Sequence, residues 1–364
     1  MSEPIDTTNN PDARRPRTPW QLFWGRLRRR RFAMAGAWIL VGLYGLALFA
    51  GFVAPGNHER QDRERFFHPP TLPRFQDWRL VVPRYEQTKG GPFVYKARTD
   101  DAKPVRFFVQ GDPYKLFWFI PTTVHLFGTG EASHPVLLFG TDQFGRDIFS
   151  RILYGSQVSL SIGLVGIALS FSFGMLAGGA AGYFGGRTDT LIMRLCELIM
   201  SIPGLYLILS LRATFPPKLS SAHVYLLIVV ILSFIGWASM ARVIRGMALS
   251  LRERQFVLAA RALGLPAWRI IVRHILPNTL SYVIVAATLS VPYYILGEVV
   301  LSYLSVGIQE PDASWGNMLT AAQNTEHLQS YPWLLAPGAA IFVTVLAFNF
   351  LGDGLRDAAD TKSN

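Results

Sequence analysis

The sequence predicts an all-α membrane protein with six spanning helices and a β-rich insert between the first two. Half of its 364 residues are hydrophobic and 16% are charged, which is less charge than soluble domains usually carry. The apolar residues gather in runs that are long enough, as helices, to cross a bilayer core of about 30 Å. Six such runs cover residues 32–54, 157–181, 190–213, 222–245, 279–304 and 331–352.

Positive charge is distributed unevenly along the chain. Residues 1–31 have the composition of a disordered basic tail, and residues 242–273 hold seven arginines against one acid, Glu253. The loop between the fifth and sixth runs holds no lysine or arginine. Because cytoplasmic flanks are enriched in basic residues, we expect the N-terminal tail, this arginine-rich segment and the C-terminal tail at 353–364 to be cytoplasmic. The same distribution accounts for the formal net charge of +11 without nucleic-acid binding.

The first apolar run, at 32–54, is too long for the core of a signal peptide, so we interpret it as a retained anchor. Residues 55–156 then form an outer insert and lead into the second span. Two β-hairpins are expected in the insert. The first joins Trp78–Tyr85 to Phe93–Arg98 around Lys89-Gly90-Gly91, and the second joins Val105–Val109 to Tyr114–Phe119 around Gly111-Asp112-Pro113.

No metal or cofactor is expected. Cys196 is the single cysteine, so the chain has no disulfide framework and no Cys/His metal pattern. The insert's four histidines are scattered along the sequence, which favours ordinary surface or core positions over a metal site. These histidines are His58, His68, His125 and His134.

Residues 157–352 contain the remaining spans, and several of their residues suggest roles. Small residues recur every fourth position from Gly166 to Gly182 in the second span, a pattern typical of close helix packing. In the third span Arg194 and Glu197 can pair, and Pro203 is expected to kink the helix. An acid as deep as Glu298, in the fifth span, is costly unless it faces a cavity or a partner. The candidate translocation-pathway residues are Glu298, Ser302 and Glu197, with interhelix hydrogen bonding as the alternative for Glu298.

The cytoplasmic segment 246–278 is expected to form a basic, amphipathic helical hairpin. An apolar stripe of Phe256, Ala260 and Leu263 predicts its first helix. Gly264 is a natural helix stop, Pro266 is a natural first residue of the next helix, and Pro277 is expected to end that helix. A structured hairpin in a cytoplasmic segment suggests a surface that a soluble partner binds.

The sequence has no nucleotide-binding or catalytic motif of its own. No glycine is followed by lysine, so a phosphate-binding loop of the G-x-x-x-x-G-K-[ST] type is absent, and neither H-E-x-x-H nor G-x-S-x-G occurs. The chain is therefore not expected to be an enzyme. Energy for uphill transport would have to come from another subunit.

The hairpin resembles the cytoplasmic loop of ABC importer permeases. The loop's Ala-Ala, Gly and Leu-Pro positions are matched by Ala259-Ala260, Gly264 and Leu276-Pro277, with Leu258 in place of the usual Glu and His274 in place of the usual Ile. Three further stretches resemble the smaller, C-type permease of dipeptide, oligopeptide and nickel importers. These stretches are 139–163, 297–319 and 349–360.

This resemblance implies a transport subunit in the cytoplasmic membrane of a prokaryote. Its implied partners are a second homologous permease, two ABC ATPase subunits and an extracytoplasmic substrate-binding protein. The implied ATPase-coupling residues surround the hairpin turn, and peptides are the implied cargo. The coupling residues are Ala259, Ala260, Arg261, Ala262, Leu263, Gly264, Leu265 and Pro266.

Two other classes stay open at this point. A self-contained channel or secondary carrier would transport without an ATPase, although the sequence lacks the internal repeat that such carriers commonly show. A membrane-anchored receptor or scaffold would use the insert as its binding domain, although six spans exceed what an anchor needs. Co-purification with an ATPase would separate both classes from a permease.

Overall fold

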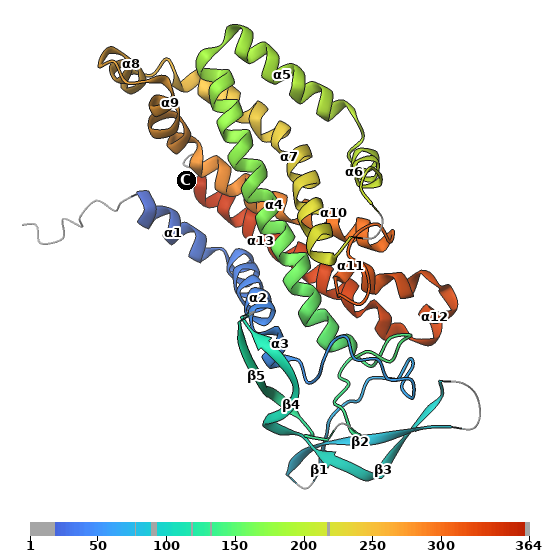
Figure 1. Cartoon of the computed structure of the whole chain (residues 1–364). Coiled ribbons are helices and arrows are strands. Elements are labelled where there is room, and N and C mark those ends of the chain that lie inside the picture. Colours follow the sequence, from blue (N-terminus) through green and yellow to red (C-terminus); the bar gives the residue numbers. More distant parts are fainter. Residues whose placement is uncertain are drawn as a thin grey trace, which may run out of the picture.

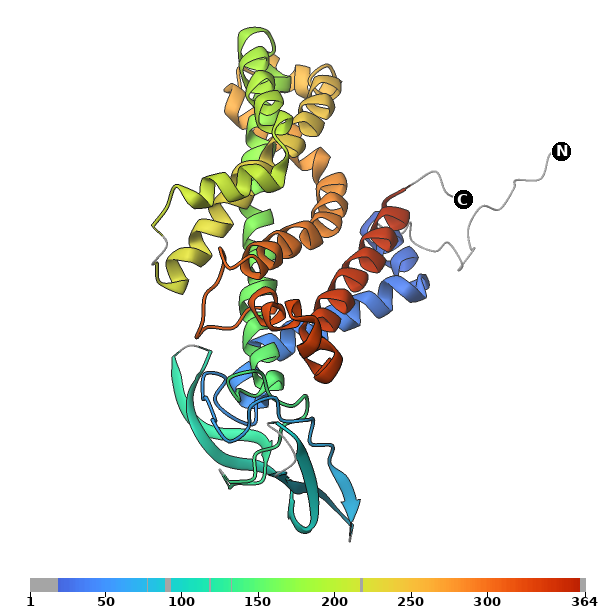
Figure 2. The same ribbon diagram turned by 90° about the vertical axis from the view of Figure 1, so that its right-hand side faces the viewer.

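The computed structural model shows a bundle of long helices with a β-rich insert at one end (Figure 1). It describes residues 19–76, 78–88, 93–117, 119–131, 133–216 and 219–360. A short helical hairpin, formed by α8 (Gln255–Ala262) and α9 (Ala267–Ile270), lies at the end of the bundle opposite the insert. In the view turned by 90°, α13 runs beside the N-terminal helices (Figure 2). The helices of the bundle are α2 (Arg31–Leu48), α3 (Ala50–Val53), α4 (Ile148–Phe184), α5 (Gly186–Ser201), α6 (Gly204–Ala213), α7 (Ser221–Leu251), α10 (Leu280–Tyr303) and α13 (Ala336–Ala359).

Five helical segments in the described residues are long and apolar enough to cross a membrane, and a sixth span exists if the bent pair α5–α6 counts as one. The predicted kink at Pro203 is a complete break. The two helices meet at 89°, with Ile202 and Pro203 in extended conformations between them. Proline disfavours helical conformation in the residue before it, which explains why Ile202 ends α5.

The predicted small-residue stripe packs α4 tightly against α7. A Cβ at Gly178 would lie 2.3 Å from the carbonyl oxygen of Ala241, and a Cβ at Gly174 would lie 2.7 Å from that of Trp237. Gly182 meets the same helix, because its Cβ would lie 2.6 Å from the carbonyl oxygen of Arg245. The prediction of a packing role is confirmed, since only glycine permits this backbone approach.

The prediction of a disordered tail through residue 31 is wrong for its last part. Pro19–Arg29 form the helix α1, and Leu27 is 3% exposed against Ala33, Leu355 and Ala358. Arg30 pairs with Asp357 at 3.2 Å. The helix forms because an apolar side chain every third or fourth residue reaches α13, which outweighs the basic composition. Residues 1–18 lie outside the described residues.

The insert forms two small antiparallel sheets, which confirms its β-rich character. β1 (Arg74–Gln76), β2 (Arg79–Gln87) and β3 (Tyr95–Pro104) make one sheet, and β4 (Arg106–Leu116) and β5 (Ile120–Gly128) make the other. Pairing of β2 with β3 confirms the first predicted hairpin, whose Lys89-Gly90-Gly91 turn lies outside the described residues.

The second predicted hairpin has its turn at the wrong place. β4 continues through Gly111-Asp112-Pro113 as an irregularity between Gln110 and Tyr114, and it pairs with β5. This turn signal is overridden by packing, because a Cβ at Gly111 would lie 2.7 Å from the His125 ring and the Asp112 carbonyl contacts that ring. The chain reverses after Leu116 instead.

Short helices cover the bundle on the insert's side, between α10 and α13. The elements are α11 (Trp315–Met318), the 3-10 turn Leu319–Gln323, α12 (Thr325–Ser330) and the 3-10 turn Pro332–Leu335.

Candidate functional site

The segment between α7 and α10 contains the predicted helical hairpin, formed by α8 (Gln255–Ala262) and α9 (Ala267–Ile270). Gly264 ends α8 at φ +75°. Its amide donates to the carbonyl oxygen of Arg261 at 3.0 Å, and the Leu265 amide donates to that of Ala260 at 3.2 Å. These bonds make a Schellman motif, which glycine favours because it has no Cβ to clash at positive φ.

The hairpin buries one face against the bundle. Val257 is fully buried and Ala260 is 4% exposed. Both pack in a small apolar cluster that also contains Ala248, Ile270 and Ile275. The hairpin is therefore held by its own hydrophobic contacts at this end of the molecule.

The predicted apolar stripe of α8 is only partly correct. Ala260 is buried, but Phe256 is 42% exposed and Leu263 is 82% exposed. The Gly264 turn folds α9 back under the face centred on Val257, so the other apolar side chains point away from the core. Together with Trp268, which is 62% exposed, they leave the tip apolar and uncovered by the described chain.

Arginines join the hairpin to α4 and join the nearby ends of α4, α5 and α7 to one another. The Arg261 guanidinium lies over the Tyr183 ring at 5.2 Å, and Arg252 donates to the Gly182 carbonyl oxygen at 3.2 Å. Arg245 of α7 makes a double hydrogen bond to Asp189 of α5, at 2.6 and 2.7 Å. Such bidentate pairs fix orientation as well as charge.

The prediction that Pro277 ends the second helix of the hairpin is wrong. The chain stays helical through a π-turn at Ile271–Ile275 and a 3-10 turn at Leu276–Thr279, and then enters α10. A wider turn just before the proline accommodates its missing N–H. The Asn278 side chain also donates to the His274 carbonyl oxygen at 2.7 Å.

At the other end of the bundle, the stretches 139–163 and 297–319 meet through ion pairs between two buried arginines and the exposed Glu310. Arg146, 3% exposed, donates to Asp142 at 2.8 Å and to both carboxylate oxygens of Glu310. Arg151, 1% exposed, donates to Glu310 at 3.1 Å and to the Pro311 carbonyl oxygen at 3.2 Å. We call these four charged residues the insert-side ion cluster. Sequence analysis missed it because its partners lie up to 164 residues apart.

Glu298 is fully buried and belongs to a separate polar network. Its carboxylate accepts hydrogen bonds from Ser159 of α4 at 2.8 Å and from Ser302 of α10 at 2.7 Å. The Ile308 amide donates to the Ser302 hydroxyl at 3.0 Å, and the Trp315 amide donates to the Ser159 hydroxyl at 3.3 Å. The network thus joins α4, α10 and the loop that follows α10.

The third candidate pathway residue lies apart from this network. Glu197 is exposed on α5 and pairs with Arg194 at 2.8 Å, which confirms the predicted ion pair. The structure therefore joins Glu298 to Ser302 and places Glu197 in a separate environment.

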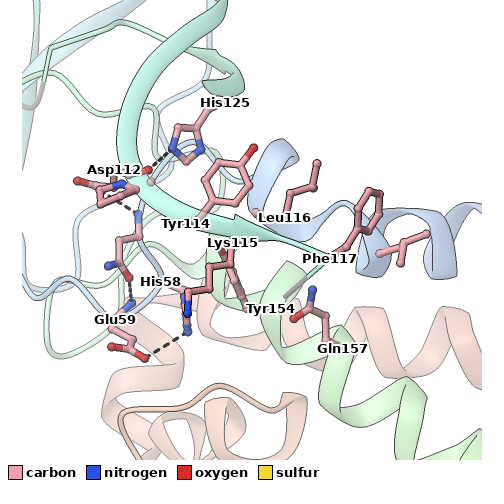
Figure 3. Close-up of a pocket in the computed structure, with 15 residues that line it drawn as sticks. His58, Glu59, Asp112, Tyr114, Lys115, Leu116, Phe117, His125, Tyr154 and Gln157 are labelled. Carbon is pink, nitrogen blue, oxygen red and sulfur yellow. Dashed lines mark hydrogen bonds and ion pairs between the residues drawn. The ribbon is translucent and has the colours of Figure 1, made fainter. Parts of the chain in front are cut away.

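A cavity of about 290 Å³ lies where the insert meets α3 and α4 (Figure 3). His125 stands between the two parts, with its Nε2 atom 2.9 Å from the Asp112 carbonyl oxygen and its Nδ1 atom 2.5 Å from the Ala54 carbonyl oxygen. The His58 ring stacks on the Tyr154 ring with centroids 3.9 Å apart. These contacts attach the insert to the end of the bundle opposite α8–α9.

Three possible metal ligands lie close together here, and two of them, His58 and Glu59, line the cavity. Ligand atoms of His58, Glu59 and Asp312 lie within 4.8 Å of one another. Burial, together with the charge of Arg151, lowers the pKa of His58 to about 4. The same guanidinium would repel a cation, so these residues fit a metal ion poorly.

Comparison with known proteins shows that one family model covers both the hairpin and most of the bundle. Residues 170–363 match the family of binding-protein-dependent transport system inner membrane components. The chain belongs to this permease family. Residues 18–70 also match the N-terminal TM domain of oligopeptide transport permease C.

Curated relatives extend the match over nearly the whole permease. A dipeptide transport system permease protein, DppC, of Bacillus subtilis is 33% identical over 340 residues, covering 93% of this chain and 84% of the relative. The oligopeptide transport system permease protein OppC of the same organism is 39% identical over 225 residues, covering 62% and 71%. OppC of Haemophilus influenzae is 38% identical over 251 residues, covering 67% and 78%.

The two family models leave most of the insert and the first part of α4 between them. Residues 71–169, which include all five described strands, belong to neither match. The hairpin and Glu298 lie inside the longer match, whereas Arg146 and Arg151 lie outside it. The two family models therefore match the hairpin and most of the bundle, and the match to the Bacillus subtilis dipeptide permease covers most of the insert as well.

Proposed function

We propose that this permease is a translocating subunit of an ATP-driven importer of dipeptides or oligopeptides. Family membership and the dipeptide and oligopeptide permeases among its relatives support this proposal. The chain lies in the cytoplasmic membrane of a prokaryote, with both termini inside. The positions of α1, α8–α9 and the end of α13 away from the insert agree with this orientation (Figure 1).

The exposed tip of the hairpin is the observation that supports ATPase coupling best. Of the eight proposed coupling residues, only Ala260 is buried and Leu265 is half-buried. Leu263 and Gly264 project furthest from the core, because α8 ends there and nothing described lies within 4 Å of a Cβ at Gly264. A rigid, uncovered, apolar and basic turn suits a cleft on an ATPase subunit.

The partners follow from the chain's missing functions. Two ABC ATPase subunits would supply the energy, since the sequence has no phosphate-binding loop. A second homologous permease would complete the pathway, and an extracytoplasmic binding protein would deliver the peptide. Closure of the ATPase dimer would move the docked hairpins and shift the permeases between inward-open and outward-open states.

The Glu298 network is our candidate for a polar element of the pathway. Glu298 of α10 accepts a hydrogen bond from Ser159 of α4, so movement of α10 relative to α4 would break this bond, whereas the bond from Ser302 lies within α10. Glu197 would act separately, from the exposed face of α5. The structural alternative, interhelix bonding alone, predicts equal effects on folding and transport.

The insert is a proposed docking shelf for the binding protein or the partner permease. Its two sheets stand on the outer end of α3 and α4 and present exposed aromatic side chains, with Trp78 at 91% and Phe119 at 73% exposure. Large exposed apolar groups at a folded surface often mark an interaction site.

Reconstitution tests the whole proposal. The permease, purified with its neighbouring subunits in proteoliposomes, should show ATP-dependent uptake of a dipeptide or oligopeptide and ATPase stimulation by the cognate binding protein. Uptake by the chain without any ATPase would instead support a self-contained carrier. Binding of a ligand with no uptake would support a receptor or scaffold.

A further inference from the structure

The apolar stripe of α1 is wider than its contact with the bundle. Trp20, Phe23, Trp24 and Leu27 follow one another at helical spacing. Phe23 and Leu27 form the half that packs against α13. Trp20 and Trp24 form the other half, and they are 67% and 39% exposed. This uncovered half begins directly before the first candidate membrane span, α2.

The remaining surface of α1 is strongly basic. Five arginines lie between positions 26 and 31, and no acid occurs from residue 19 to residue 48. The Arg28 guanidinium lies over the Trp24 ring, 5.1 Å from its centroid, so the two side chains form one surface. Arg30 is partly neutralised by Asp357, whereas Arg28 and Arg29 are exposed.

We propose that α1 lies in the cytoplasmic interface of the bilayer and binds anionic phospholipid headgroups through Arg28 and Arg29. Indole rings prefer the depth of the headgroups, and arginines beside them attract anionic lipids. Packing of Phe23 and Leu27 on α13 holds the helix at a fixed depth, because α13 is itself a candidate span. This inference rests on the proposed orientation of the N-terminus, but it concerns lipid binding and not transport.

The positive charge of α1 beside its exposed aromatic rings favours an anionic lipid over a protein partner. The exposed half of α1 combines aromatic rings with arginines over a single stripe and continues into a spanning helix, which is the pattern of an interfacial helix. A protein contact at the same place would be expected to cost subunit association when the arginines are replaced.

The experiment measures phospholipid affinity of the purified transporter complex in detergent. Native mass spectrometry would follow titration with phosphatidylglycerol, and with phosphatidylcholine as the neutral probe. Arg28→Gln/Arg29→Gln should weaken phosphatidylglycerol binding by about 30-fold, because each arginine contributes about 1 kcal/mol to binding of anionic lipid. Phosphatidylcholine binding should be unchanged. Arg28→Lys/Arg29→Lys should retain most of the affinity, because the charge is kept.

A matched control removes the same charge at the other end of the molecule. Arg79→Gln/Arg106→Gln replaces two exposed arginines of the insert and should leave phosphatidylglycerol affinity unchanged. Equal affinities of the α1 variant and the parent would overturn the proposal, as would an equal loss in the control. Loss of a subunit from the complex, with lipid affinity intact, would show that α1 contacts protein. Failure of peptide uptake would refute the proposed function without changing these affinities.

Discussion

Substitution of Gly264 separates the conformation of the hairpin turn from its role in docking. Most other residues at φ +75° strain the backbone by roughly 1–2 kcal/mol. Asparagine tolerates this region and strains the backbone less. A Cβ at this position meets nothing within 4 Å, so neither Asn nor Trp clashes inside the chain. Gly264→Asn therefore reports the backbone effect, and Gly264→Trp adds a large ring at the proposed docking surface.

The expected difference between the two variants comes from overpacking. Forcing extra volume into a packed contact costs typically 1–3 kcal/mol, which would weaken docking about 5- to 150-fold. In proteoliposomes with all subunits, Gly264→Asn should retain most of the peptide uptake. Gly264→Trp should insert normally but lose uptake and the ATPase stimulation that the binding protein gives. Equal uptake by the Trp and Asn variants would refute the assignment of this turn to ATPase coupling.

Three further changes test the bundle, the buried network and the insert. Gly178→Leu should lower the thermal stability of the permease by forcing α4 from Ala241, whereas Gly246→Leu, with open space at its Cβ, should not; equal melting temperatures would contradict the packing argument. Glu298→Gln should reduce uptake more than membrane abundance, because the amide cannot accept from both serines through two oxygens; parallel losses on immunoblots and in uptake would indicate a structural role. Replacing residues 74–128, the strands alone, by a short linker should abolish ATPase stimulation by the binding protein, and stimulation at the parent level would exclude the docking shelf.

Features set by local chemistry could be predicted from the sequence. The apolar runs, the small-residue stripe of α4 and the helix stop at Gly264 each depend on residue type and spacing within one element. The Arg194–Glu197 pair is also local, since the two residues are three positions apart. These predictions agree with the structure because no distant contact competes with them.

Features set by distant contacts could not be predicted in the same way. The Gly111-Asp112-Pro113 signal gave the wrong turn because packing against His125 keeps β4 continuous. The insert-side ion cluster joins Arg146 to Glu310 across 164 positions, and neither residue has a local signature. The helix α1 does carry a local signal, its Trp20–Leu27 stripe, but the arginine-rich composition concealed it.

Continuity from the hairpin into α10 gives the permease a nearly uninterrupted rod. Helical backbone runs from Ala267 to Tyr303, 37 residues or roughly 55 Å at 1.5 Å per residue. Its first residue, Ala267, lies close to the Gly264 turn, and Glu298 lies near its other end. A tilt of the helix at one end would therefore move the other end directly, because no flexible loop lies between them. The π-turn at Ile271–Ile275 and Pro292 are the places where such a rod would bend, and a single-residue deletion between them would rotate Glu298 by about 100° about the helix axis.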